Sequence, residues 1–327
     1  MRNLLILFVA ALMCGCSSQS SSTDDLSESG GKKYQLAVIP KGTAHEFWKS
    51  IHAGASKGAK ERGAEIIWKG PQVENDTAGQ IETMRNFITK QVDGICLAPN
   101  HSEALKEVVE EAKLSGIPVV VFDSGLAAGA EFISYVATNN FHGGELGADQ
   151  LAKAIGEKGD VILMRYRAGS ESTEQREEGF LAGMNKYPNI NVVSSDQYGE
   201  ATTQQALEKS TNLLQKYGDQ IQGVFAVNES NCNGMLEALE NSGHAGKIKF
   251  VAFDPSAKLI AAMKEDKVHG IVLQDPVGMG YQAVNTMIDH LEGKAVAKEV
   301  STGEYVATPE NIDSEDSQRL LHPEMVE

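Results

Sequence analysis

The stretch Gly-Ile-Pro-Val-Val-Val-Phe-Asp, residues 116–123, decides how this chain folds. Directly before it, Glu103 to Leu114 places apolar residues on one face of a predicted helix and charged residues on the other. Gly116 and Pro118 are residue types that end a helix and favour an extended chain. The four apolar residues that follow are typical of a parallel strand buried on both faces. The segment therefore predicts a helix and then a buried strand, with Asp123 at the carboxyl end of the strand.

The same unit recurs along most of the chain. Short apolar runs, separated by segments of helical length, lie at residues 36–39, 66–68, 95–98, 119–122, 161–164, 192–193, 224–227, 250–253 and 271–273. About ten strand-and-helix repeats are too many for one open sheet of ordinary size. A chain of 327 residues is long enough for two domains. The sequence therefore predicts an α/β fold of two doubly wound, parallel-sheet lobes.

The first residues predict export and attachment to a membrane. Arg2 precedes an apolar run, Leu4 to Leu12, that is too short to cross a bilayer permanently and is typical of a secretory signal peptide. The following residues, Met13-Cys14-Gly15-Cys16, resemble a bacterial lipobox, in which a small residue precedes the cysteine that receives lipid. This pattern favours Cys16 as the lipidated residue. An ordinary signal peptide with two incidental cysteines is the alternative.

Residues 17–33 predict a flexible tether between the lipoprotein signal region, residues 1–16, and the folded lobes. They are rich in serine, with acidic residues and glycine, and hold almost no apolar side chain that could form a core. The formal net charge of −16 argues against nucleic acid as a partner and against direct adsorption to anionic lipid. We therefore expect a periplasmic protein that contacts either the inner or the outer membrane through its lipid alone.

Nothing in the sequence predicts a metal site, a cofactor or a catalytic residue. Cys96 and Cys232 lie far apart, and free buried thiols are expected rather than a disulfide or a metal centre. The chain has no Gly-x-Gly-x-x-Gly after a strand, no phosphate loop and no Gly-x-Ser-x-Gly elbow. An enzyme on the same α/β scaffold is therefore a remote alternative.

Polar residues at strand ends predict the edge where a ligand binds. Asp123, Asn228, Asp254 and Gln274 each come directly after an apolar run. In doubly wound sheets, ligands bind beyond the carboxyl ends of the strands. A single Asp or Asn in this position is more often the cap of the next helix than a ligand contact. Four such strand ends, distributed over both halves of the chain, favour a ligand site.

Five motifs, in this order, are similar to the bacterial periplasmic sugar-binding proteins of the ribose-binding type. They lie at residues 36–39 with 45–48, 117–123, 176–180, 223–229 and 251–254, and the similarity spans Tyr34 to Thr308. The resemblance implies two lobes joined by a three-strand hinge, with the chain crossing near Asn139, Gln274 and Ser301. The predicted lobes are then residues 34–138 with 275–300, and residues 139–274 with 301–327.

The resemblance and the chemistry of sugars together suggest the candidate binding residues. A sugar offers apolar C–H faces to aromatic rings and a rim of hydroxyls to polar groups. Phe47 and Trp48 match the stacking pair of the family, although core packing is their alternative role. Arg176 would donate a fork of hydrogen bonds, with a solvated helix position as its alternative. The strand-end aspartates would accept hydrogen bonds from hydroxyls, and the strand-end Asn and Gln would both donate and accept.

Several positions argue against ribose itself as the ligand. His45 stands where the ribose binders carry asparagine, and Ser124 stands where they carry arginine. Tyr198 is near the position of the family's aromatic residue in the second lobe, but its spacing differs. Tyr166, at the end of another predicted strand, is the alternative. A pentose, a hexose, a deoxysugar or a polyol therefore all remain candidates.

The predicted function is solute import. A lipid-anchored, monomeric binding protein would close around a small sugar or polyol by hinge motion and deliver it to an ABC permease and its ATPase. A receptor that presents its closed form to a sensor kinase or chemoreceptor is the alternative.

Overall fold

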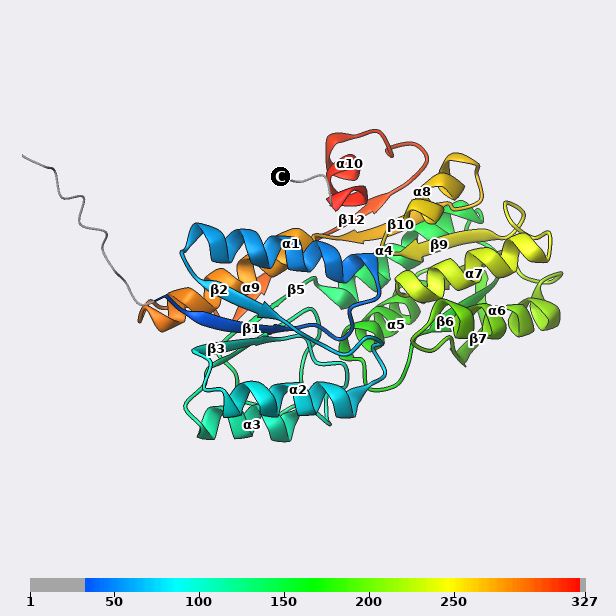
Figure 1. Cartoon of the computed structure of the whole chain (residues 1–327). Helices are drawn as coiled ribbons and strands as arrows, with labels where there is room; N and C mark the ends of the chain where they lie inside the picture. The colour runs from blue at the N-terminus through cyan, green and yellow to red at the C-terminus, as the bar shows by residue number, and fades with distance from the viewer. Residues whose placement is uncertain (1–32, 324–327) are drawn as a thin grey trace, which may run out of the picture. The chain divides into compact units, whose positions relative to one another are not determined.

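Two six-stranded sheets form the framework of the protein in a computed structural model that describes residues 33–323 (Figure 1). The predicted signal peptide, the lipidation site at Cys16 and the tether up to Lys32 lie outside the described residues. So do residues 324–327. Both sheets are built from the repeating strand and helix units that the sequence predicts, which confirms the predicted fold class.

The first sheet has the strand order β11-β5-β4-β3-β1-β2, and all of its paired strands are parallel. Its strands are β1 (Gln35–Ile39), β2 (Glu65–Trp68), β3 (Gly94–Leu97), β4 (Val119–Phe122), β5 (Tyr135–Ala137) and β11 (Glu299–Ser301). One face packs against α1 (Glu46–Glu61) and α9 (Pro276–Leu291), and the other packs against α2 (Thr77–Thr89) and α3 (Lys106–Leu114). We call these elements the first lobe.

The second sheet has the strand order β12-β10-β9-β8-β6-β7. Its strands are β6 (Gly159–Arg165), β7 (Ile190–Tyr198), β8 (Gly223–Ala226), β9 (Lys249–Phe253), β10 (Gly270–Gln274) and β12 (Glu304–Ala307). One face packs against α4 (Asn140–Ala154) and α5 (Glu171–Met184). The other packs against α6 (Thr203–Tyr217), α7 (Glu229–Asn241), α8 (Ala257–Lys264) and α10 (Glu315–Leu321). We call these elements the second lobe.

The chain crosses between the two sheets after β5, between β10 and α9, and between β11 and β12. The strands β5, β11 and β12 were not predicted as strands, because none of them contains a long apolar run. β12 runs antiparallel to β10, at the edge of a second sheet whose other paired strands are parallel. It enters the edge of that sheet directly from β11, so its direction is set by the crossing.

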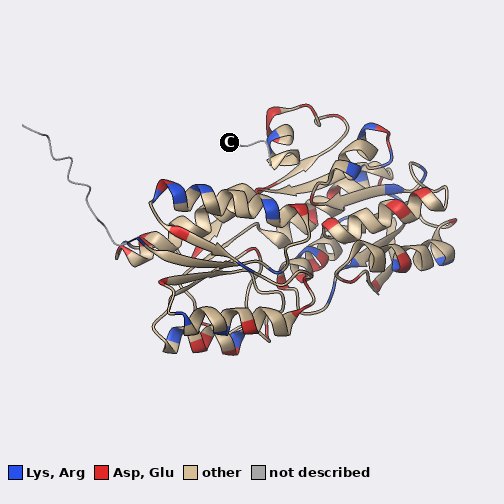
Figure 2. Ribbon diagram, viewed as in Figure 1, with Lys and Arg blue, Asp and Glu red and all other residues tan. Residues whose placement is uncertain are grey.

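Most of the apolar runs that predicted the strands are buried, and those of the edge strands β2 and β7 are half-buried. Cys96 and Cys232 are free and buried, as predicted, and burial raises the pKa of both thiols. Figure 2 shows basic and acidic segments intermixed along the helices. None of the helices between Lys33 and Pro323 combines the length and the apolar character that crossing a membrane requires.

In the first lobe, α1 and α9 approach each other closely at two glycines. A Cβ atom at Gly54 would lie 1.9 Å from the carbonyl oxygen of Val277 on α9. A Cβ atom at Gly280 would lie 2.1 Å from the carbonyl oxygen of Ile51 on α1. Both contacts are with backbone atoms, so neither can be relieved by a side-chain rotation. The two glycines therefore fix how α1, whose first turn carries the candidate residues Phe47 and Trp48, is placed on the sheet.

We expect Gly54→Ala to lower the free energy of unfolding by about 1–3 kcal/mol, because the added methyl group forces α1 away from α9. Denaturant unfolding measures this change. The matched control is Gly58→Ala, one turn later on α1, where a Cβ atom would lie 3.0 Å from the Asn285 amide nitrogen and 3.2 Å from the Tyr281 carbonyl oxygen. This variant should lower stability less than Gly54→Ala, because these contacts are much less close and alanine favours helix over glycine. Equal effects of the two substitutions would contradict the close-packing account.

Candidate functional site

A polar cavity lies at the carboxyl ends of the strands of both sheets. It is lined by Lys41, His45, Phe47, Trp48, Glu74, Asp123, Ser172, Thr173, Arg176, Asn228, Glu229, Asp254 and Gln274. The structure thus brings together all of the predicted site residues except Ser124 and Tyr198. Both lobes contribute, as expected for a ligand held beyond the strand ends.

Two buried aspartates occupy equivalent places in the two lobes. Asp123 follows β4 and Asp254 follows β9, with exposed fractions of 3 % and 4 %. Both adopt left-handed backbone conformations, with φ of 62° and 67°. A residue other than glycine rarely adopts this conformation, and such strain is concentrated at functional sites. The sharp turn directs each carboxylate off the end of its strand and into the cavity.

Each aspartate has a cation beside it in its own lobe. Lys41 Nζ is 3.0 Å from Asp123, and Arg176 Nη1 is 3.7 Å from Asp254. Burial raises the pKa of Asp254, although Arg176 and Gln274 partly offset that shift. A buried carboxylate is costly unless it is paired, so each of the two cations stabilises the aspartate beside it.

Arg176 is held by its surroundings in a fixed orientation. Its Nε donates to Asn140 Oδ1 at 2.8 Å, and its Nη1 donates to the Val227 carbonyl at 2.9 Å. The guanidinium also lies 3.9 Å from the centre of the Phe253 ring. These contacts exclude its alternative role as a solvated helix residue, since the side chain is buried.

Two strand-end amides present hydrogen-bond acceptors to the cavity. Gln274 Nε2 donates to Asp254 Oδ1 at 2.7 Å, and Asn228 Nδ2 donates to the Ser230 hydroxyl at 3.1 Å. The Oε1 of Gln274 and the Oδ1 of Asn228 are buried and have no hydrogen-bond partner among residues 33–323. Buried polar atoms are almost always paired, so these oxygens are suited to accept from a ligand.

The aromatic pair forms one wall, and Glu74 organises it. Phe47 and Trp48 pack edge to face, with ring centres 5.0 Å apart. Trp48 also belongs to the core of the first lobe, so its packing role and its place at the cavity coexist. Its Nε1 donates to Glu74 at 2.7 Å, His45 Nδ1 is 2.9 Å from Glu74, and Tyr166 donates to Glu74 at 2.6 Å.

The Glu74 cluster holds a charged histidine. Burial alone would lower the pKa of His45, but the charge and hydrogen bond of Glu74, with Glu229 and Asp254 nearby, raise it to about 9. Burial likewise opposes the charged form of Glu74, yet His45, Lys41 and Tyr166 hold its pKa well below the usual range. His45 and Glu74 are therefore an ion pair at neutral pH.

The lobes also bond directly to each other beside the cavity. At one side, the backbone amides of Glu46 and Phe47, at the start of α1, donate to the carboxylate of Glu229 at 3.3 and 3.1 Å. Glu229 thus caps a helix of the first lobe from the second lobe. At another point, Ser102 donates its amide hydrogen to the Gly169 carbonyl at 2.8 Å. Burial raises the pKa of Glu229, and the charge of His45 partly offsets this.

Two predicted residues lie elsewhere. Tyr198 is 36 % exposed at the end of the edge strand β7, where the Arg165 guanidinium lies 6.0 Å from its ring centre. Tyr166, left open as an alternative, is buried and bonds to Glu74 instead. Ser124 lies next to the cavity wall, where its hydroxyl accepts from the amide of Ser172 at 3.0 Å.

Sequence reasoning missed several residues of the cavity wall: Lys41, Glu74, Ser172, Thr173 and Glu229. Lys41 and Glu74 follow β1 and β2, so the strand-end rule extends to them. They were not predicted because they lie a few residues beyond the apolar runs, in loops whose course cannot be read from the sequence.

Comparisons with protein families and with known proteins relate this chain to the same kind of protein. The model of the periplasmic binding protein domain family matches residues 36–295. The ribose import binding protein of Bacillus subtilis is 31 % identical over 291 residues, which cover 89 % of this chain and 92 % of that protein.

Solved structures agree. A carbohydrate transporter solute-binding protein from Agrobacterium radiobacter, in complex with D-arabinose, superposes with a TM-score of 0.85 at 32 % identity, covering 89 % of this chain and 99 % of that one. An ABC transporter solute-binding protein from Agrobacterium vitis, bound with α-D-tagatopyranose, gives 0.84 at 29 % identity, covering 88 % and 99 %.

The raised pKa of His45 predicts a specific pH dependence of stability. Because protonated His45 is favoured in the folded state, its contribution is complete below the unfolded pKa of 6.5 and is lost as the pH rises through about 9. We expect the stability difference between the wild type and His45→Gln to shrink by about 1–3 kcal/mol between pH 6 and pH 10. Denaturant unfolding of both proteins across this range measures it, and a constant difference would contradict the His45–Glu74 ion pair.

Proposed function

The chain belongs to the periplasmic binding protein family, as a type I sugar-binding protein, and from this membership we propose that it delivers a small sugar or polyol to an ABC importer. The members of this family are periplasmic proteins. The related proteins are binding proteins of transport systems, and the chain is likewise a binding protein and not an enzyme. The importer would consist of a permease and its ATPase, and the binding protein would act as a monomer.

The observation that carries the proposal is the polar cavity between an aspartate pair and an aromatic wall. Asp123 and Asp254 face the cavity from opposite lobes, while Phe47 and Trp48 line it from α1. A sugar ring needs such a combination, because its hydroxyls require fixed acceptors and its C–H faces require apolar surface. Gln274 and Asn228 supply further acceptors beside the aspartates.

Binding would require the lobes to separate and close again. The cavity has a volume of about 20 Å³, room for about one water molecule. Contacts such as Phe47 with Glu229 hold the two lobes together beside it. A sugar therefore enters an open form, and its bonds to both lobes favour the closed form that a permease can recognise.

The ligand class is best described as a small neutral sugar or polyol. Relatives are named for ribose, D-allose and xylitol, and the related structures hold D-arabinose and α-D-tagatopyranose. The protein would carry its ligand site on a tether, anchored by lipid at Cys16.

A ligand panel tests this function. We expect at least one pentose, hexose or polyol to raise the melting temperature, because a ligand at 100 times its Kd stabilises the folded state by about 2.7 kcal/mol. For that ligand, Asp123→Ala or Asp254→Ala should weaken binding by about tenfold or more in calorimetric titration, since each removes a charged hydrogen bond.

The matched control for these variants is Asp266→Ala. Asp266 also has a left-handed backbone, with φ of 57°, but its side chain is 79 % exposed and lies away from the cavity. It should leave affinity unchanged. Unchanged affinity in both cavity variants would remove the aspartates from the site, and no binder in the whole panel would refute the proposed ligand class.

Lipidation is tested separately in cells. We expect labelled palmitate to be incorporated into the wild type and into Cys14→Ser, but not into Cys16→Ser, because Gly15 provides the small residue that the lipobox requires before Cys16. Incorporation into Cys16→Ser would place the lipid on another residue. The absence of label in all three proteins would indicate an ordinary signal peptide without lipidation.

A further inference from the structure

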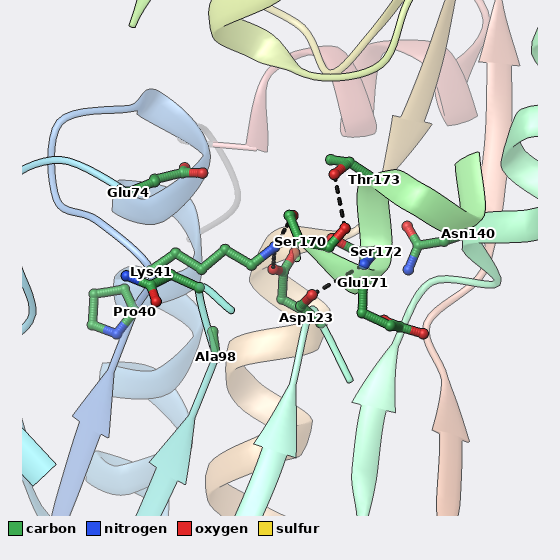
Figure 3. A network of polar contacts seen from close by, with 12 residues as sticks. Pro40, Lys41, Glu74, Ala98, Asp123, Asn140, Ser170, Glu171, Ser172 and Thr173 are labelled. Carbon is green, nitrogen blue, oxygen red and sulfur yellow. Dashed lines mark hydrogen bonds and ion pairs between the residues drawn. The ribbon is translucent and has the colours of Figure 1, made fainter. Parts of the chain in front are cut away.

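Lys41 is a buried cation whose partners come from both lobes. It lies just beyond β1, and its side chain is 4 % exposed. Its ammonium is 3.0 Å from Asp123 Oδ2 in the first lobe. It donates to the hydroxyls of Ser172 at 2.9 Å and Ser170 at 3.3 Å in the second lobe (Figure 3). The ammonium is therefore held by one ion pair within its own lobe and by two hydrogen bonds to the other lobe.

The first lobe alone determines where the Lys41 charge lies. Asp123 is fixed at the end of β4, where its amide donates to the Val136 carbonyl at 3.0 Å. An unpaired buried charge is costly, so the ammonium stays close to this carboxylate. Ser170 and Ser172, in contrast, reach Lys41 only when the second lobe is docked, because they lie at the start of α5.

The same segment of the second lobe makes two backbone contacts with the first lobe. The Gly125 amide donates to the Glu171 carboxylate at 2.7 Å, and the Ser172 amide donates to the Ser124 hydroxyl at 3.0 Å. Both hydrogen bonds join opposite lobes and lie beside the Lys41 cluster. Their two amide hydrogens therefore report whether this contact is formed.

We propose that Lys41 is a positioning residue for lobe closure: held by Asp123, it presents a fixed positive charge that the hydroxyls of Ser170 and Ser172 bind when the second lobe docks. The inference rests on the proposed hinge-closing function. The contact involves no ligand atom, so it stabilises the closed form with every ligand and without one. Loss of the charge lowers the closed population, and apparent affinity falls in proportion.

Hydrogen–deuterium exchange of the ligand-free full chain tests the proposal. In Lys41→Met, which keeps an unbranched side chain of similar shape but removes its charge, we expect the amides of Gly125 and Ser172 to exchange at least about tenfold faster, the change that accompanies loss of one charged hydrogen bond. Amides in the core strands β3 and β8 should keep their rates. A purely structural defect would instead accelerate exchange in the core as well.

Two further variants complete the test. Ser170→Ala removes one acceptor of Lys41 outside the cavity lining, and should accelerate the same two amides to a smaller extent. Lys49→Met removes an exposed lysine that pairs with Glu46 on its own helix, and should change neither amide. The proposal is overturned if Lys41→Met keeps its core protection and exchanges at Gly125 and Ser172 like the wild type. If Lys41→Met loses core protection, the test rests on Ser170→Ala. Exchange of the Gly125 and Ser172 amides at the wild-type rate in that variant then overturns the proposal.

Binding measurements separate this role from ligand contact. With the sugars that bind, Lys41→Met should weaken affinity by the same factor for each, because closure is common to all of them. A changed order of preference would show that Lys41 selects the ligand directly and would overturn the positioning role. If no sugar binds the wild type, the proposed function fails, while the exchange rates still report on Lys41.

Discussion

The arrangement of the site depends on pairing two buried carboxylates with cations. Asp123 and Asp254 follow equivalent strands of the two lobes, in left-handed backbone conformations, and are almost fully buried. Removing the partner of a buried charge typically costs about 3–5 kcal/mol, so each carboxylate fixes a cation beside it. Arg176 is then locked further by an amide, a carbonyl and an aromatic ring. The polar cavity is therefore preorganised: its charged groups are positioned before any ligand arrives.

Close contacts between glycines and backbone carbonyls position the helices of the site in both lobes. In the second lobe, a Cβ atom at Gly144 would lie 2.1 Å from the Arg176 carbonyl, and one at Gly179 would lie 1.9 Å from the Phe141 carbonyl. This close contact of α4 with α5 parallels that of α1 with α9. In each lobe, a glycine contact thus fixes a helix that carries cavity residues, so core packing and ligand geometry are set by the same positions.

Sequence reasoning succeeded where the signal was local. Buried parallel strands appear as apolar runs, and Asp123 and Asp254 follow such runs directly, so both the fold class and these residues were predictable. Lys41 and Glu229 were not, because their role arises from contacts between residues more than a hundred positions apart. Tyr198 was misplaced for a related reason: spacing alone did not show that β7 is an edge strand that carries it to the surface.

The pairing of donors and acceptors limits what the cavity can recognise. Its three cations already have protein partners, namely Lys41 with Asp123, Arg176 with Asp254, and His45 with Glu74. The buried side-chain oxygens that lack hydrogen-bond partners among residues 33–323 include those of Gln274 and Asn228. An anionic ligand would have to displace existing ion pairs, whereas a hydroxyl can donate to these oxygens without breaking any. The charge balance of the site therefore favours ligands that bring donors, as sugars and polyols do.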